Sequence, residues 1–210
     1  MNNERRDFDQ AAATWDEKPQ RVKLAGEVAD AIIREVSLTS DMNALDFGCG
    51  TGLLTLRLQP FVRTIIGADS SRGMLDILNA KIVAAGLDNV CSMHCDPAQG
   101  DALKGKYHLI VSSMTLHHVQ EIEPLFALFH AAMIPGGTLC LADLDLDEGQ
   151  FHADSTGVFH DGFDRAAVRT ALTTAGFIEV RDLTVTEIVK PAADGTTRSF
   201  SVFLMIARKK

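Results

Sequence analysis

The sequence predicts an α/β protein whose mostly parallel sheet carries helices on both faces. Helix-like periodicity alternates with short apolar, strand-like stretches along most of the chain, and this alternation favours parallel strands joined by helical crossovers. The chain ends in two strand-like stretches, 178–190 and 197–209, around PAADGT, which has the composition of a hairpin turn. The hairpin predicts at least one antiparallel strand at the edge of the sheet.

Three helices and three strands alternate in the first half of the chain. Apolar residues recur at helical spacing from Val22 onward and form one stripe of the first helix. Pro60 ends the second helix, and Ser70 or Ser71 caps the third, which ends near Gly86. The predicted helices span 21–38, 53–60 and 71–86, and the predicted strands span 42–47, 63–69 and 89–96.

The second half continues the alternation around two longer loops. Residues 97–106 are polar, and a long loop follows the fifth strand up to about residue 162. The motif IPGG at 134–137 predicts a turn, and Asp164 is placed to cap the last helix. The predicted strands span 106–113 and 138–145, and the predicted helices span 123–133 and 164–177.

The composition is that of one globular domain, which we expect to span residues 1–210. Hydrophobic residues make up 46% and charged residues 23% of the chain, as in ordinary proteins with a proper core. The net charge of -8 disfavours general binding to the nucleic-acid backbone. No apolar run approaches the ~20 residues that span a bilayer, and the N-terminus lacks a signal-peptide pattern. We therefore expect a cytoplasmic protein without membrane insertion, as a monomer or homodimer.

The four cysteines do not indicate a disulfide scaffold in a chain of this size. The stretch CSMHC raises the alternative of a metal site. Its cysteines lie on a predicted strand, where Cys91, Met93 and Cys95 share one face, and no second ligand pair follows at zinc-site spacing. We therefore expect small buried residues of a strand and no metal.

The stretch ALDFGCGTG, residues 44–52, places three glycines between a predicted strand and a predicted helix. Without a Cβ atom, Gly48, Gly50 and Gly52 allow a sharp turn and the close approach of any adenosine cofactor. Their spacing fits neither the G-x-G-x-x-G dinucleotide fingerprint nor the P-loop. The carboxylate of Asp46 opposes a pyrophosphate and favours an ammonium or sulfonium group. The loop therefore predicts an adenosine ligand without phosphates.

Acidic and hydroxyl side chains end the other predicted strands as well. In an open α/β sheet the ligand binds at these carboxyl ends. Asp69, 21 residues after Gly48, is placed to accept hydrogen bonds from both hydroxyls of a ribose, and Asp96 to meet the exocyclic amine of adenine. Each alone has the alternative of a helix cap or a solvated loop charge, but with Asp46 and Ser112 they form an ordered set.

Together these motifs resemble those of the class I S-adenosylmethionine-dependent methyltransferases of the small-molecule type. LDFGCGTG resembles the first motif of that family, GADSSRGML the second and CDP the third. YHLIVSSMTLHHV is similar to the fourth-strand motif, MIPGGTLCLADLD to the turn and fifth strand, and AGF to the start of the terminal antiparallel pair. The resemblance covers the chain from about residue 40 to its end.

This resemblance implies a Rossmann-like three-layer sandwich with a seven-stranded sheet, whose last strand is inserted antiparallel. It implies S-adenosyl-L-methionine as cofactor, S-adenosyl-L-homocysteine as product, and methyl transfer to a small-molecule acceptor by in-line displacement. It does not identify the acceptor. The residues that it assigns to the cofactor are Asp46, Gly48, Cys49, Gly50, Gly52, Asp69, Ser70, Met74, Asp96, Pro97, Ser112 and Ser113.

Histidines are the candidates for catalysis, although a general base is required only when the nucleophile must lose a proton. His117 and His118 follow the fourth strand, where one of them would orient or deprotonate an acceptor; the alternative is packing against the next helix. His160 lies with His152 in the loop after the fifth strand, where functional residues are frequent; the alternative is a loop held in place by Phe159 and Phe163.

A lid over the acceptor is expected from one of two segments. The first is the N-terminal arm, 1–20, in which Phe8 and Trp15 would anchor the lid or else pin the arm to the core. The second is the loop 146–162.

Two other functions stand beside methyl transfer. A nicotinamide-dependent oxidoreductase is disfavoured by the glycine spacing and by Asp46. A non-catalytic partner subunit that binds the cofactor is compatible with intact motifs. Titration calorimetry with S-adenosylmethionine, S-adenosylhomocysteine and NAD separates the oxidoreductase from the other two.

The assignment of Asp69 predicts that Asp69→Ala weakens cofactor binding by more than ~1 kcal/mol, because a charged hydrogen bond to the ribose is lost. Titration calorimetry with S-adenosylhomocysteine measures the change. An unchanged dissociation constant would contradict the assignment.

Overall fold

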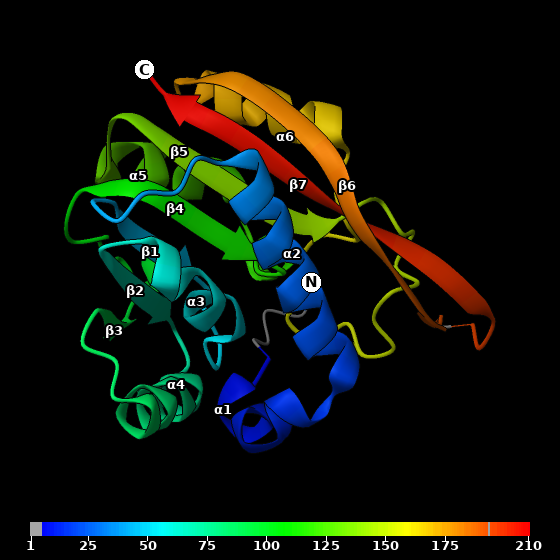
Figure 1. The fold of residues 1–210 in the computed structure, drawn as a ribbon. Helices are drawn as coiled ribbons and strands as arrows, with labels where there is room; N and C mark the ends of the chain where they lie inside the picture. Colours follow the sequence, from blue (N-terminus) through cyan, green and yellow to red (C-terminus); the bar gives the residue numbers. More distant parts are fainter. Residues whose placement is uncertain (1–5, 193) are drawn as a thin grey trace.

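In the described residues, 6–192 and 194–210, the computed structural model shows seven strands in one sheet and six α-helices around it (Figure 1). The strands are β1 (Asn43–Phe47), β2 (Thr64–Asp69), β3 (Val90–His94), β4 (Tyr107–Ser113), β5 (Met133–Leu144), β6 (Phe177–Pro191) and β7 (Thr197–Lys209). The α-helices are α1 (Phe8–Ala11), α2 (Pro19–Glu35), α3 (Leu53–Leu58), α4 (Arg72–Ala85), α5 (Ile122–Ala132) and α6 (Arg165–Thr174). Short 3-10 helices are η1 (Ala12–Glu17), η2 (Gln59–Phe61), η3 (Pro97–Gln99) and η4 (Leu116–His118).

The strand order is β3-β2-β1-β4-β5-β7-β6, with β1 to β5 parallel and β7 antiparallel to both of its neighbours. This confirms the predicted seven-stranded sheet with a C-terminal antiparallel hairpin. The prediction of an antiparallel strand at the edge of the sheet is also confirmed: β7 lies inside the sheet, and the edge strand β6 pairs antiparallel with it. The burial of the two strands explains this order: residues 202–207 of β7 are all buried, whereas only Phe177 is buried in β6.

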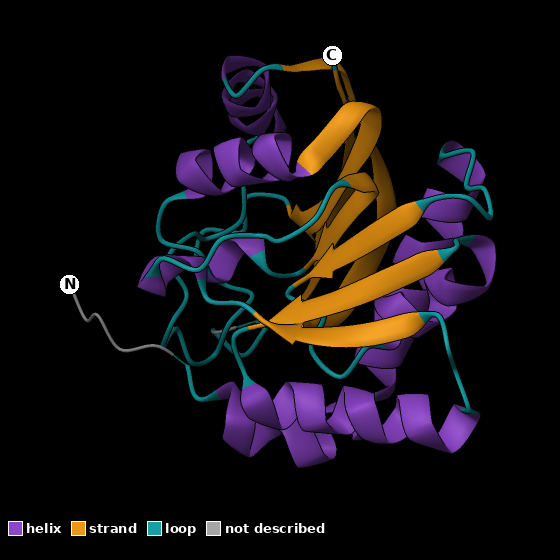
Figure 2. Ribbon diagram, turned by 90° about the vertical axis from the view of Figure 1, so that its left-hand side faces the viewer, coloured by secondary structure: helices purple, strands orange, loops and turns teal. Residues whose placement is uncertain are grey.

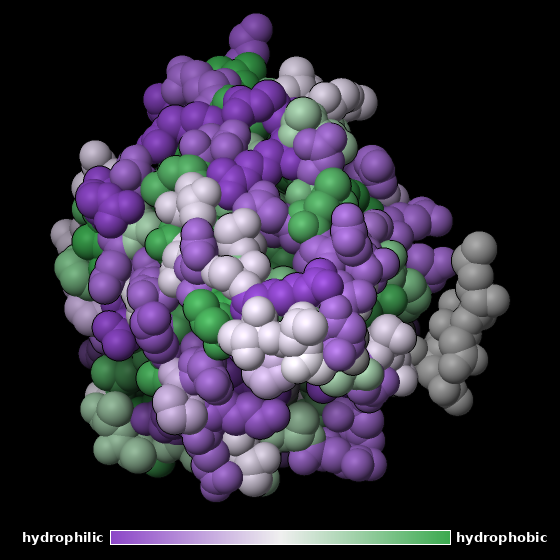
Figure 3. Space-filling model, turned by 90° about the vertical axis from the view of Figure 1, so that its right-hand side faces the viewer, coloured by the Kyte–Doolittle hydropathy of each residue, from purple (hydrophilic) through white to green (hydrophobic). Residues whose placement is uncertain are grey.

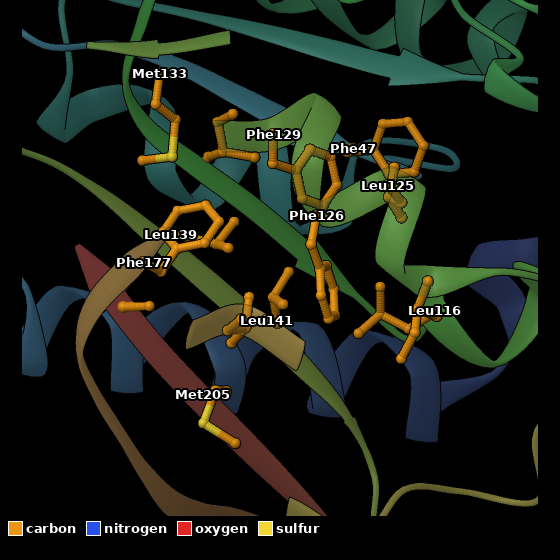
Figure 4. Close-up of a cluster of buried hydrophobic side chains, with 14 of the residues drawn as sticks. Phe47, Leu116, Leu125, Phe126, Phe129, Met133, Leu139, Leu141, Phe177 and Met205 are labelled. Carbon is orange, nitrogen blue, oxygen red and sulfur yellow. The ribbon is translucent and has the colours of Figure 1, made fainter. Parts of the chain in front are cut away.

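Helices cover both faces of the sheet, as the three-layer prediction requires (Figure 2). Successive side chains of a strand point to opposite faces, so each face has its own core. On one face α5 and α6 pack around Phe126 and Phe129 (Figure 4). On the other face α2 and α3 pack through residues such as Val28, Ile32 and Leu58. The loops that follow the parallel strands gather at one end of the sheet (Figure 2).

The motif IPGG lies within β5 and not in a separate turn as predicted. Tyr107 pairs with Met133 and Leu109 with Thr138, so residues 134–137 bulge out of the ladder between the two pairs. The turn conformation is still present there, because Gly136 has a φ of 78°.

The N-terminal segment from Arg6 onward forms α1 and η1, which lie against α4 (Figure 1). Asp9 accepts a hydrogen bond from the Gly73 amide at 2.8 Å, in the first turn of α4. Asp16 accepts a hydrogen bond from Thr51 Oγ1 at 2.6 Å. The two aspartates therefore hold the arm against the start of α4 and against the glycine loop. Residues 1–5 of the predicted arm lie outside the described residues.

The surface is mostly hydrophilic on the face that Figure 3 shows, with apolar residues in small scattered groups. Of the two cysteines expected to be buried on β3, Cys95 is buried and Cys91 is exposed. The prediction is wrong for Cys91 because β3, the strand that contains it, is an edge strand of the sheet and has a neighbouring strand on one side only. Among the helices of the described residues, none combines the length and apolarity needed to cross a membrane.

We predict that Phe129→Ala lowers the free energy of unfolding by about 3–5 kcal/mol, because the ring is fully buried and its loss leaves a cavity. Urea denaturation measures the change. Val83→Ala on α4 is the control, since its side chain is 80% exposed and should cost less than about 0.5 kcal/mol. Equal effects of the two substitutions would contradict the assignment of the core.

Candidate functional site

A cavity of about 1200 Å³ opens at the carboxyl ends of the parallel strands. Of the twelve residues predicted to hold the cofactor, ten line it: Asp46, Gly48, Cys49, Gly50, Asp69, Ser70, Met74, Asp96, Pro97 and Ser113. Gly52 and Ser112 are not among the lining residues. Residues spread over more than sixty positions of the chain therefore meet at one edge of the sheet, as the parallel topology predicts.

The glycine loop connects β1 to α3 through three left-handed residues, with φ of 72° at Gly48, 53° at Gly50 and 84° at Gly52. A Cβ atom at Gly48 would lie 2.2 Å from Thr115 Oγ1, and one at Gly52 would lie 2.4 Å from Leu78 Cδ1. At Gly50 the nearest atom would be 3.9 Å away. Gly50 is therefore the glycine with room for a ligand beside it, and Gly52 is required for packing against α4.

Two other predicted residues have roles within the protein. The hydroxyl of Ser112 donates to the carbonyl of Phe47 at 2.8 Å and joins the end of β4 to the end of β1. Cys49 lines the cavity, but burial raises the pKa of its thiol well above the ordinary value. Cys49 therefore stays protonated, as expected of a small buried residue in a tight turn and not of a nucleophile.

Asp46 is buried at the end of β1, and its Oδ2 accepts a hydrogen bond from Thr55 Oγ1 at 2.6 Å. Burial, with the nearby charge of Asp69, raises the pKa of Asp46 to about 7 against the lowering effect of the hydrogen bonds from Thr55. The carboxyl group is thus about half ionised at neutral pH. A cationic group in the cavity would favour its ionised form.

Asp69 and Asp96 line the cavity at the ends of β2 and β3. The two carboxylate oxygens of Asp69 accept hydrogen bonds from the amides of Gly50 and Ser71, both at 2.8 Å. Burial nevertheless raises the pKa of Asp69. Asp96 accepts from the amide of Ala98 at 3.1 Å, so it caps η3 as its alternative interpretation proposed, and it also faces the cavity.

His117 has a buried acidic partner that the sequence did not reveal. Its Nδ1 lies 2.6 Å from Oδ1 of Asp143 at the end of β5, and both side chains are buried. Asp143 also accepts from the amides of Leu116 and Leu144. Although burial opposes its ionisation, His117 and these amides hold the pKa of Asp143 below its usual value. The only indication in the sequence was the position of Asp143 in LADLD, where it stands between apolar residues of a buried strand.

Three histidine rings meet beside this pair. The ring centroid of His117 lies 4.2 Å from that of His118 and 5.0 Å from that of His152. Burial, with the charge of His117, lowers the pKa of His118 to about 4 and that of His152 to about 3, so both are neutral at pH 7. In the part of the chain that the structure describes, no group of three or more His, Cys, Asp or Glu has the arrangement of a metal site.

His160, the third predicted catalytic histidine, is not among the cavity-lining residues. Its Nε2 lies 2.9 Å from the carbonyl oxygen of Val119, and its ring packs on Phe163. These contacts hold the loop 146–162 in place, so we assign no chemistry to His160.

Both segments expected to form a lid line the cavity. Phe8 of the arm packs edge-on against His118 at 5.1 Å and against Trp15 at 5.9 Å. In the loop 146–162, the carbonyl of Gly157 accepts from His118 Nδ1 at 2.7 Å. A Cβ atom at Gly157 would lie only 2.5 Å from the amide nitrogen of Arg6, so the loop and the arm touch each other at the cavity.

Comparison with known proteins identifies the family. A family model described as "Methyltransferase domain" matches residues 20–177. The chain belongs to this methyltransferase family. The resemblance to class I S-adenosylmethionine-dependent methyltransferases is thereby confirmed, and S-adenosylmethionine is the cofactor that this resemblance implies. Its adenosine part requires a wide cavity with acidic groups, and the cavity at Gly50, Asp69 and Asp96 fits that requirement.

The relatives and solved structures show the same class of protein. The methyltransferase is 31% identical to an uncharacterised methyltransferase of Schizosaccharomyces pombe over 59% of this chain and 48% of that protein. It spans about half the length of the curated relatives it matches. A phosphoethanolamine N-methyltransferase of Haemonchus contortus with bound S-adenosyl-L-methionine has a TM-score of 0.71 at 15% identity, over 86% of this chain and 52% of that one. An S-adenosylmethionine-dependent methyltransferase of Aquifex aeolicus has a TM-score of 0.69 at 17% identity, over 95% and 97% of the two chains.

The raised pKa of Asp46 predicts a pH-dependent loss of stability. Below about pH 4 both folded and unfolded chains hold this proton; above it the unfolded chain releases the proton, and the folded protein keeps it until about pH 7. Unfolding therefore becomes more favourable as the pH rises from about 4 to 7. Asp46→Asn has no carboxyl group to ionise, so it lacks this loss of stability. As the pH rises from about 4 to 7, the free energy of unfolding of the variant should increase relative to that of the wild type by at most about 4 kcal/mol.

Urea denaturation of the two proteins at a series of pH values measures this difference. Asp76→Asn on α4 is the control, because it changes the same chemical group outside the cavity. A constant difference between Asp46→Asn and the wild type from pH 4 to 8 would show that Asp46 ionises normally.

Proposed function

We propose that this chain transfers the methyl group of S-adenosylmethionine to a small-molecule acceptor by in-line displacement, with His117 as the group that orients or deprotonates the acceptor. The observation that carries the proposal is the contact between His117 and Asp143, in the same cavity as the carboxylates at the ends of β1, β2 and β3. The cofactor side of the proposal rests on the family; the acceptor and the role of His117 are inferences from geometry.

The cofactor side of the cavity is built from Gly50, Asp69 and Asp96. When bound, S-adenosylmethionine supplies a methyl group made electrophilic by its sulfonium. Gly50 gives the ligand access to the backbone, and the carboxylates of Asp69 and Asp96 are the acceptors for ribose hydroxyls and for the adenine amine. Asp46 is the carboxyl group on this side that a bound cation would ionise.

The state of His117 follows from its partner. A carboxylate accepts but does not donate, so Nδ1 of His117 carries a hydrogen, and Nε2 carries a lone pair whenever the ring is neutral. Asp143 fixes the ring orientation and stabilises the positive charge that arises if Nε2 takes a proton. Asp143 is thus a positioning residue, and His117 is the candidate catalytic residue.

His118 and His152 fit a supporting role. Their lowered pKa values keep them uncharged beside His117, so the cluster does not carry three like charges. His118 donates from Nδ1 to the loop 146–162, which places that loop over His117. We propose that this loop and the N-terminal arm together form the lid over the acceptor.

Calorimetry tests the cofactor half of the proposal. S-adenosylhomocysteine should bind and NAD should not; tight NAD binding without S-adenosylhomocysteine binding would support the oxidoreductase alternative. A protein that binds S-adenosylhomocysteine but methylates nothing in a broad acceptor screen with labelled methyl groups would support the partner-subunit alternative.

For an acceptor found in that screen, we predict that His117→Asn lowers kcat by about 100-fold, because the proton acceptor is lost. The dissociation constant of S-adenosylhomocysteine should stay within about twofold of the wild type. Asp143→Asn should lower kcat as well and shift the pH profile of kcat, an effect that a purely structural role would not produce. His108→Asn is the control, because His108 accepts from the amide of Asn43 at the opposite end of the sheet. Unchanged kcat in His117→Asn would exclude it as the base.

A further inference from the structure

Four cationic side chains line the cavity, and one of them, Arg6, also lines a smaller pocket with Asp96 and Ser70. Arg6 comes from the arm, Lys18 and Arg21 from the start of α2, and Lys190 from β6. The cofactor-binding carboxylates lie at the ends of β1, β2 and β3, whereas β6 is at the other edge of the sheet. Such a concentration is unexpected in a chain with a net charge of -8.

No ion pair within residues 6–192 and 194–210 neutralises these cations. Among the ion pairs formed by the described residues, none includes Arg6, Lys18, Arg21 or Lys190. Burial lowers the pKa of Lys190, and the charges of Lys18 and Arg6 lower it further against the effect of Asp147. Burial and the charge of Arg6 likewise lower the pKa of Arg21, against the effect of Asp16. The side chains repel one another and so form a region of positive potential.

Acidic groups near this region do not remove that potential. Asp154 lines the cavity but is exposed, so solvent screens it. Asp16 is already bound to Lys81 and Thr51. Asp147 acts on Lys190 but binds the amides of its own loop.

Aromatic rings hold two of the cations in place. The guanidinium of Arg21 lies 3.4 Å from the centre of the Trp15 ring, and the ammonium of Lys190 lies 3.6 Å from the centre of the Phe151 ring. Arg21 also donates to the carbonyl of Trp15 at 3.3 Å. The same part of the cavity is therefore both apolar and positively charged.

A second observation points to a ligand here. Nε2 of His152 is buried and has no hydrogen-bond partner among the described residues. His152 lines the cavity beside His117 and senses the charges of Lys190 and Arg6. An unpaired buried ring nitrogen is costly unless a bound molecule supplies its partner.

We propose that the methyl acceptor is a small organic anion, with a carboxylate or phosphate bound by Lys18, Lys190 and the two arginines, and an apolar part against Phe8, Trp15 and Phe151. This inference rests on the proposed function, because it assigns the acceptor half of the same cavity. The cofactor cannot account for the four cations, since S-adenosylmethionine carries one carboxylate and a net positive charge. That positive charge attracts an anionic acceptor as well.

The test uses the full chain saturated with S-adenosylhomocysteine and four matched probes: benzoate, phenyl phosphate, benzamide and benzylamine. The probes share one ring and differ in charge, so calorimetry separates the charge preference from apolar binding. Either benzoate or phenyl phosphate should bind at least about tenfold more tightly than benzamide, and benzylamine should bind most weakly. The better of the two anions distinguishes a carboxylate acceptor from a phosphate acceptor.

The double variant Lys18→Met/Lys190→Met should reduce the anion preference by about tenfold, because methionine keeps the apolar stem and removes the charge. Lys23→Met is the matched control: Lys23 is on the same helix as Arg21, is exposed and pairs with Glu27, and should leave the preference unchanged. Thermal unfolding of each variant checks that it is folded.

Three results would overturn the inference. The first is binding of benzamide or benzylamine as tight as that of both anions. The second is no measurable binding of either anion, and the third is an anion preference that survives in the double variant. Binding of S-adenosylhomocysteine is measured separately. If the wild type does not bind it, the proposed function is refuted. If the wild type binds it but shows no anion preference, only the acceptor class is refuted. The probes are also titrated without S-adenosylhomocysteine, so the anion preference is tested in either case.

Discussion

The structure of the site depends on carboxylates buried at the ends of parallel strands, each of which must find hydrogen-bond donors away from water. Asp46 finds the Thr55 hydroxyl on α3, and Asp69 finds the amides of the glycine loop and of the start of α4. Asp143 finds His117 and the amides beside it. In each case the donor belongs to the segment that forms the cavity wall, so the buried charge and the shape of the wall are fixed together.

The fold could be predicted from the sequence because its signals are local. Apolar periodicity and the caps Ser71 and Asp164 define the helices. Both caps are formed as predicted, because their side chains accept hydrogen bonds from the amides of Met74 and Ala166. The order of the last two strands could not be derived from the hairpin alone, because a hairpin does not say which of its strands pairs with the rest of the sheet. The family resemblance supplied that order, and the burial of 202–207 explains it.

The residues that we assign to the cofactor could be placed from the sequence more readily than those that we assign to the acceptor, for the same reason. Its residues follow strands directly and keep fixed spacings, so parallel topology alone brings Asp46, Asp69 and Asp96 together. Lys190 lies on a strand whose place in the sheet is set by long-range pairing, and Asp143 reads as one more residue of a buried strand. Gly52 and Ser112 fit the motif, but their neighbours Leu78 and Phe47 show that they serve packing and strand connection.

The carboxylates and the cations of the cavity come from different elements of the fold. Carboxylates are concentrated at β1 to β3 and suit a cofactor with a sulfonium and an ammonium group, whereas the cations come from α2, the arm and β6. Unit charges about 4 Å apart interact by about 4 kcal/mol at an effective dielectric of ~20, so the carboxylates favour a cationic group beside them and the cations favour an anionic one. His117 and Asp143 follow β4 and end β5, and these strands lie between β1–β3 and β6 in the strand order. A cationic methyl donor and an anionic acceptor would therefore meet at the residue that is placed to accept a proton.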